Sequence, residues 1–280
     1  MKAYSTGLEL VLNAAEGLLQ IVVTDNEVPL CVQEWNLPRR STEILAPALR
    51  EICAALGIKA GDFRRVACVH GPGSFTGIRL VLTTAAALRR AGRARLAGLN
   101  YLQSLAATVA VNRRLPFEAR IAVVTHARRD LVHFCPFVSL GPEIPPWPLH
   151  ETRLLTPREA LADALSLWRG RLPVYMCGSG LARNAFVFEA CGERIVLAPE
   201  CANPVAAALR IQARHGEYFD GDIEPAYLRP CDAVENLPHF AAQRGEDGGE
   251  AVARLEDMLA RPPKSERASP SSKHFKVKMP

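Results

Sequence analysis

Apolar positions in the first 35 residues fall into short runs separated by polar breaks, a pattern typical of β-strands. The runs are LELVLNA, GLLQIVVTD and PLCVQEW, and the breaks lie at Glu16–Gly17 and at residues 25–27. Runs of this length, rich in Leu, Val and Ile and bounded by turn residues, predict a β-meander.

The pattern changes to helical spacing after residue 40. Apolar residues recur every three or four positions between residues 44 and 56. We expect Ser41 or Thr42 to cap this helix and Gly57 to end it. Pro47 lacks a backbone donor, so it should lie near the first turn or bend the helix.

Strands and helices alternate through the rest of the first 115 residues. FRRVACVH predicts a buried strand, and the glycine-rich segment GPGSFTGIR follows it directly. A helix over residues 78–92, a strand over 94–100 and a helix over 101–112 complete the order. Strands first in a meander and then alternating with helices predict a mixed sheet with helices on its faces.

A second part with a similar order of strands and helices begins near residue 116. Strand-like runs cover residues 120–128, 130–140 and 172–180, and helices are expected over 156–170 and 202–217. The first of these helices carries Thr156, Pro157 and Glu159, the residues of a capping box with proline at the first helical position.

The composition changes again at about residue 232. Segments rich in Pro, Ser, Gly and charge follow, with one helical pattern over residues 251–260. We therefore predict three parts: an N-terminal lobe over 1–115, a smaller lobe over 116–231, and a largely disordered tail over 232–280.

Composition narrows the class of protein. The chain has 280 residues, a net charge of +5 and eight cysteines, none of them in a CxxC pair. We therefore expect the cysteines to be reduced thiols in a cytoplasmic protein, and we expect no zinc site. The opening apolar segment contains four polar residues and is too short to span a bilayer, so no membrane association is predicted.

The glycine-rich segment fits none of the standard phosphate or nucleophile templates. It has no Gly-Lys-Ser/Thr end, its glycine spacing is one residue longer than G-x-G-x-x-G, and Ser74 follows Gly73 directly. A tight strand-to-helix turn is the local interpretation, with an unusual φ at Gly73, a cap from Ser74 or Thr76, and Phe75 in the core. An anion site at the helix start stays open as the alternative.

Small residues follow one side of the helix after this segment. Such a side lets a second helix approach closely, although packing on its own sheet is the alternative. The expected partner interface consists of Gly77, Leu80, Thr84, Ala87 and Ala91.

These features resemble the TsaB family, also called YeaZ. The strand RVACVH followed by GPGSFTGIR is the most specific similarity. LELVLNAAEGLLQIVV, STEILAPALREI, AGLNYLQSLA, VVTHARRDLVHF, CGSGLA and EPAYLRP resemble further family segments in the expected order, over about residues 8–231.

The resemblance implies an α/β, actin-like fold of the ASKHA superfamily, with two related ribonuclease H-like lobes. It implies a non-catalytic subunit that stabilises or activates a TsaD-like protein, which modifies adenosine beside the tRNA anticodon with a threonylcarbamoyl group. A TsaE-like ATPase would join the complex, and tRNA would be met through it. The glycine loop that carries the resemblance is Gly71, Pro72, Gly73, Ser74, Phe75, Thr76, Gly77 and Arg79.

Two departures bear on catalysis. Asn13 and His126 stand where the family usually has aspartates, and actin-like kinases need a carboxylate there to hold Mg²⁺ against phosphate. We find no acid–base pair, so no catalytic residue, metal ligand or intrinsic cofactor is predicted. His70, before the loop, is expected to be a satisfied strand-end histidine.

Other functions stay open on the sequence alone. They are an actin-like ATP-binding enzyme, a glycopeptidase-like protein, and a stand-alone homodimer. The sequence does not decide between a heterodimer and a homodimer, whether a nucleotide lies at the subunit junction, or what the basic tail does.

Overall fold

The structure is a computed structural model that describes residues 7–37, 40–128, 130–189, 191–227 and 237–260. Its first sheet has the strand order β3-β2-β1-β4-β5. β1 and β2 are antiparallel, as are β2 and β3, whereas β1, β4 and β5 run parallel. The bounds are β1 Leu8–Asn13, β2 Leu18–Asp25, β3 Val28–Asn36, β4 Arg65–Gly71 and β5 Arg95–Asn100.

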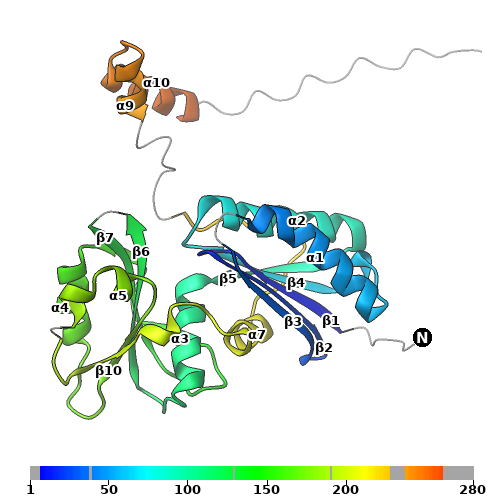
Figure 1. Cartoon of the computed structure of the whole chain (residues 1–280), viewed down its shortest axis with the longest axis horizontal. Coiled ribbons are helices and arrows are strands. Elements are labelled where there is room, and N and C mark those ends of the chain that lie inside the picture. The colour runs from blue at the N-terminus through cyan, green and yellow to red at the C-terminus, as the bar shows by residue number, and fades with distance from the viewer. Residues whose placement is uncertain (1–6, 38–39, 129, 190, 228–236, 261–280) are drawn as a thin grey trace, which may run out of the picture. The chain divides into compact units, whose positions relative to one another are not determined.

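Helices cover both faces of this sheet (Figure 1). α1 and α2 pack on one face with the side chains of Leu10 and Leu12, while α3 and α7 pack on the other with Val11. The alternation of inward residues along β1 thus places the sheet between two apolar layers. The bounds are α1 Ser41–Leu56, η1 Ala60–Asp62, α2 Phe75–Gly92, α3 Tyr101–Asn112 and α7 Ala206–Arg214.

The second sheet repeats the first. Its order is β11-β10-β6-β7-β8, with β9 also paired to β7. β6 and β7 are antiparallel, and β10 and β11 run parallel to β6. The bounds are β6 Arg120–Arg128, β7 Leu131–Val138, β8 Trp147–Pro148, β9 Arg153–Leu155, β10 Val174–Cys177 and β11 Ile195–Ala198.

The helices of the second lobe fall at corresponding places in the order. α4 precedes β10, the short α5 and α6 precede β11, and α7 follows it. Each lobe therefore has a three-strand meander followed by two parallel strands and their helices. The sequence analysis expected this similar order of strands and helices in the two parts. The bounds are α4 Pro157–Ser166, α5 Gly180–Arg183, α6 Ala185–Phe188 and η2 Pro199–Cys201.

The two lobes share one apolar core. Buried side chains of α3, among them Leu105 and Val109, cluster with Val11 of the first sheet and with Ile121 and Val123 of the second. α3 and α7 lie between the two sheets in Figure 1. Because burial of large aliphatic side chains stabilises by about 1.5–3 kcal/mol each, this shared layer holds the lobes as one unit.

The chain divides into two compact units, residues 1–228 and 229–280. Within the second, α9 Leu237–Gln243 and α10 Gly248–Ala260 are helices. The helical pattern expected over 251–260 is thus present. The sequence predicted a largely disordered tail over 232–280 with this one helix, whereas α9 is a further helix that it did not predict. Residues 232–236 and 261–280 of the tail lie outside the described residues, and the lobe boundary at residue 115 stays a prediction.

The N-terminal cap predicted from the sequence is confirmed in α4 and is wrong in α1. Thr156 and Glu159 form the expected capping box at the start of α4, with Pro157 at its first position. The expected cap of α1 is wrong, because the residue before the helix is Arg40 and makes no side-chain cap hydrogen bond. Pro47 lies inside α1. Among the described helices, none has the length and apolar character needed to cross a membrane.

Candidate functional site

The glycine loop joins β4 to α2 by a sharp corner. Gly71 has a φ of 133°, and a Cβ there would lie 2.6 Å from the carbonyl oxygen of Ala226. The unusual φ therefore lies at Gly71, and its expected place at Gly73 is wrong. Only glycine fits at residue 71, since L side chains rarely adopt this φ and the facing atom is backbone.

The next two glycines of the loop pack against the turn between β1 and β2. A Cβ on Gly73 would lie 2.5 Å from the carbonyl oxygen of Ala15, and one on Gly77 would collide with the carbonyl oxygen of Ala14. The Ser74 amide donates to the Ala15 carbonyl over 2.6 Å. The loop is thus a packing device that brings the start of α2 directly onto the first hairpin.

The two side-chain roles expected in the loop have different outcomes. Ser74 caps α2, because its hydroxyl accepts from the Gly77 amide at 3.3 Å. The expected burial of Phe75 is wrong: the residue is 40% exposed, and its ring stacks on that of Tyr227 with a centroid separation of 5.5 Å. Arg79 lies over Phe75 at 3.8 Å and donates to the Tyr227 hydroxyl.

The predicted interface residues do not all face the same way. Gly77 is buried against its own hairpin, so its expected place on an accessible face is wrong. Leu80 and Thr84 are half-buried, and the Thr84 hydroxyl donates to the Leu80 carbonyl at 2.8 Å. Ala87 and Ala91 are exposed. A small-residue surface thus remains along α2 from Leu80 to Ala91.

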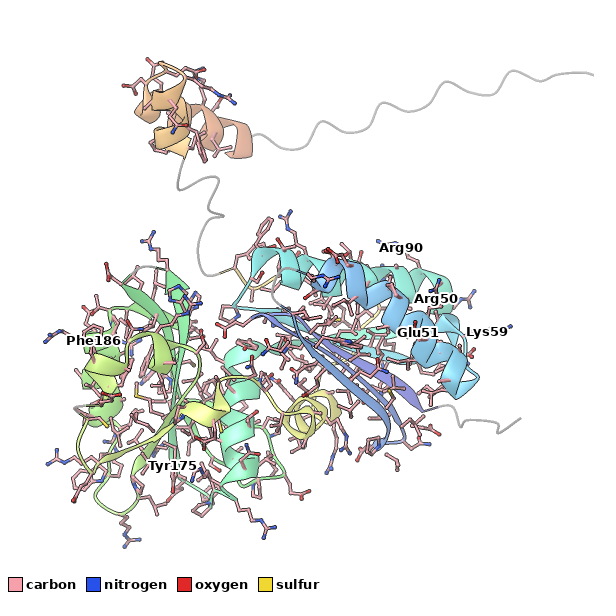
Figure 2. All side chains as sticks on the ribbon, viewed as in Figure 1. Arg50, Glu51, Lys59, Arg90, Tyr175 and Phe186 are labelled. Carbon is pink, nitrogen blue, oxygen red and sulfur yellow. The ribbon has the colours of Figure 1, made fainter. Side chains whose placement is uncertain are left out.

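A segment near the end of the first unit borders this surface. Asp222 accepts hydrogen bonds from Arg89 and Arg90 near the end of α2, while Tyr227 meets Arg79 near its start. Figure 2 shows Arg90 on the same outer layer as Arg50 and Glu51 of α1. Sequence reasoning missed these pairings, since neither Asp222 nor Tyr227 lies within 130 residues of its partner.

A polar cluster that sequence reasoning missed joins the two lobes. Glu16, in the turn between β1 and β2, accepts hydrogen bonds from the Ser179 hydroxyl at 2.9 Å and the Tyr101 hydroxyl at 3.2 Å. Ser179 also accepts from the His126 amide at 3.0 Å. Burial raises the pKa of Glu16 to about 7. The sequence could have indicated this cluster, because Glu16 lies between two apolar runs and a carboxyl that is buried there requires hydrogen-bond partners.

Asn13 and His70, which the sequence analysis singled out, are both engaged in local hydrogen bonds. The Asn13 amide donates to Gln20 at 2.7 Å, and its oxygen accepts from the Ala15 amide at 3.0 Å. His70 contacts the Glu224 carbonyl at 3.1 Å through Nδ1, and burial lowers its pKa, as expected of a satisfied strand-end histidine. Within the described part of the chain, no group of three or more His, Cys, Asp or Glu residues is arranged to hold a metal ion.

The duplicated strand order, with Glu16 of the first hairpin bonded to Ser179 after β10, defines a two-lobed α/β fold. Residues 36–144 match the family model described as TsaD, tRNA N6-adenosine threonylcarbamoyltransferase. The chain is therefore similar to the TsaD family over residues 36–144, and its fold is similar to that of solved YeaZ structures.

Two solved structures from Pseudomonas aeruginosa share the fold. One is a protein described as similar to the peptidase YeaZ, with 21% identity and a TM-score of 0.66, covering 80% of this chain and all of that one. The other is YeaZ, with 19% identity and a TM-score of 0.63, covering 79% of this chain and all of that one. The comparison with curated proteins gives no match.

Proposed function

We propose that this protein is a non-catalytic subunit of the tRNA threonylcarbamoyladenosine modification machinery, and that it stabilises or activates a TsaD-like subunit. The match of residues 36–144 to the TsaD family and the YeaZ fold support involvement in this modification. The observation that carries the subunit role is the surface of α2, where the small side chains of Thr83, Ala87 and Ala91 are exposed.

The chemistry of α2 fits a packed helical partner. Half-buried Leu80 and exposed Ala87 offer apolar contact, while Thr83 and Thr84 satisfy their hydroxyls on the helix's own carbonyls. A partner helix can therefore approach without leaving those hydroxyls unpaired. A TsaD-like subunit is the proposed occupant, and a second copy of the chain is the alternative.

The non-catalytic part of the proposal rests on the lobe junction. Asn13 brings no charge there, and its amide is already used within the hairpin. Glu16 brings a carboxyl that is held by two hydroxyl donors. A cytoplasmic location and contact with tRNA through the complex are further parts of the proposal.

Replacing Ala87 with Arg tests the partner surface. A long charged side chain there would hold off the partner helix or be buried unpaired, which weakens association by about 100-fold. We expect the Ala87→Arg protein to lose its TsaD-like partner in affinity purification from the native cell. The matched control is Ala162→Arg, which adds the same side chain to the exposed face of α4 in the other lobe.

The outcomes separate the alternatives. Equal recovery of the partner with both variants would refute the α2 surface. If no TsaD-like protein is recovered with the wild-type chain, and Ala87→Arg converts a dimer to a monomer by light scattering, the stand-alone homodimer is correct.

Purified alone, the chain is expected to show no ATP hydrolysis above a vector control. Actin-like kinases hold metal ions against phosphate, and the residues that the structure describes include no group of three or more His, Cys, Asp or Glu placed to hold a metal ion. Release of inorganic phosphate is the measurement. Turnover that disappears in a Ser74→Ala variant would contradict the proposal and favour the ATP-binding enzyme.

A further inference from the structure

Glu16 is a titratable residue of the first hairpin whose carboxyl is hydrogen-bonded to the second lobe. It lies in the turn between β1 and β2, and its carboxyl meets Ser179, in the turn that follows β10. The same serine oxygen accepts from the His126 amide at the end of β6. The Ser179 hydroxyl proton is thereby directed to Glu16, and the three groups form one chain of hydrogen bonds across the lobes.

The surroundings of Glu16 are closely packed and contain few charged groups. Tyr101, at the start of α3, is fully buried and directs its hydroxyl at the second carboxyl oxygen. Gly178 and Gly180 hold the Ser179 turn directly against the backbone of Val124. The charged or titratable groups that act on this carboxyl are Tyr101 of α3 and Arg183 of α5. β6 adds the titratable residue His126, whose amide donates to Ser179. The glycine loop adds Arg79 at its far end, which contacts Phe75 and Tyr227.

We propose that Glu16 is a proton-controlled latch between the two lobes: the neutral carboxyl favours the closed junction seen here, and the ionised carboxylate favours an opening that lets water reach it. The physical reason is that closure removes much of the half-buried carboxyl from water. A desolvated carboxylate costs free energy that two hydroxyl donors only partly return. Opening the Glu16–Ser179 contact restores hydration of the charge, so protonation and closure are thermodynamically linked.

The raised pKa places this transition near neutral pH. If the opened carboxyl has its ordinary pKa of 4.5 and the closed one a value of about 7, the ratio of open to closed molecules rises about tenfold between pH 6 and pH 8. The latch therefore works in the range where a cell's own pH varies, and it acts on the junction and not on the partner surface of α2.

Hydrogen exchange of the full-length chain tests the latch. After correction for intrinsic rates, amides in segments 13–18 and 177–183 are expected to exchange about tenfold faster at pH 8 than at pH 6. The Glu16→Gln variant should show no such change. Glu51→Gln, on the exposed surface of α1, is the matched control and should behave as the wild type.

Two further results make the outcome decisive. Ser179→Ala retains the carboxyl but removes its contact across the lobes, so exchange in segment 13–18 should be faster than wild type at both pH values. Equal corrected exchange of the wild type at pH 6 and pH 8, or an unchanged pH response in Glu16→Gln, would overturn the proposal. If Glu16→Gln fails to fold, the ¹³C carboxyl shift of Glu16 in the wild type decides: titration near pH 4.5 would refute the latch.

Discussion

Replacing Gly77 with Ala is expected to lower the free energy of unfolding by about 2 kcal/mol or more. The new Cβ would collide with the carbonyl oxygen of Ala14, in the turn of the first hairpin. Overpacking of this kind costs about 1–3 kcal/mol, and more where the obstructing atom is backbone, because the hairpin or the helix must then move. The better helix propensity of Ala returns only about 1 kcal/mol, so the steric term decides the sign.

The matched control for this substitution is Gly57→Ala. Gly57 ends α1 at a φ of 66°, and nothing lies within 4 Å of a Cβ built there. In that variant Ala meets no neighbouring atom and only has to adopt a left-handed backbone conformation, which costs about 1 kcal/mol. Urea unfolding followed by circular dichroism measures both. A Gly77→Ala protein as stable as Gly57→Ala would show that α2 does not press on the first hairpin.

The fold was predictable because its signals are local. The meander at residues 8–36, the alternation that follows and the capping box at Thr156 all depend on neighbours within a few positions. The resemblance of the glycine loop to the TsaB family then predicted that these elements form two related lobes. What the spacing could not supply was the direction of single side chains, and so Phe75 was placed in the core although it stacks on Tyr227 at the surface.

The candidate site was only partly predictable for the same reason. The small-residue face of α2 follows from helical spacing, but Gly77 turns inward because the first hairpin lies against it. Glu16 and Ser179 are 163 residues apart, and no periodicity links them. Contacts of that kind depend on how the duplicated lobes fold onto α3, which is a tertiary property.

The raised pKa of Glu16 predicts that the free energy of unfolding depends on pH. Its folded-state pKa of about 7 lies above the ordinary value of 4.5, so the folded chain binds a proton between these pH values that the unfolded chain has released. The free energy of unfolding contributed by this group therefore falls as the pH rises from 4.5 to 7, and is nearly constant above that range. The loss is at most about 3 to 4 kcal/mol, and less to the extent that water reaches the half-buried side chain.

Glu16→Gln isolates this contribution from other titrating groups such as His70. The variant cannot ionise, and its amide oxygen still accepts from Ser179 or Tyr101. We expect wild type and variant to be similar in stability at pH 5, and the variant to be more stable by about 1–3 kcal/mol at pH 8, from urea unfolding across this range. A variant that is less stable than wild type at pH 8 would mean that the two hydroxyl donors outweigh desolvation. In that case the charged carboxylate, and not the neutral acid, holds the lobes together.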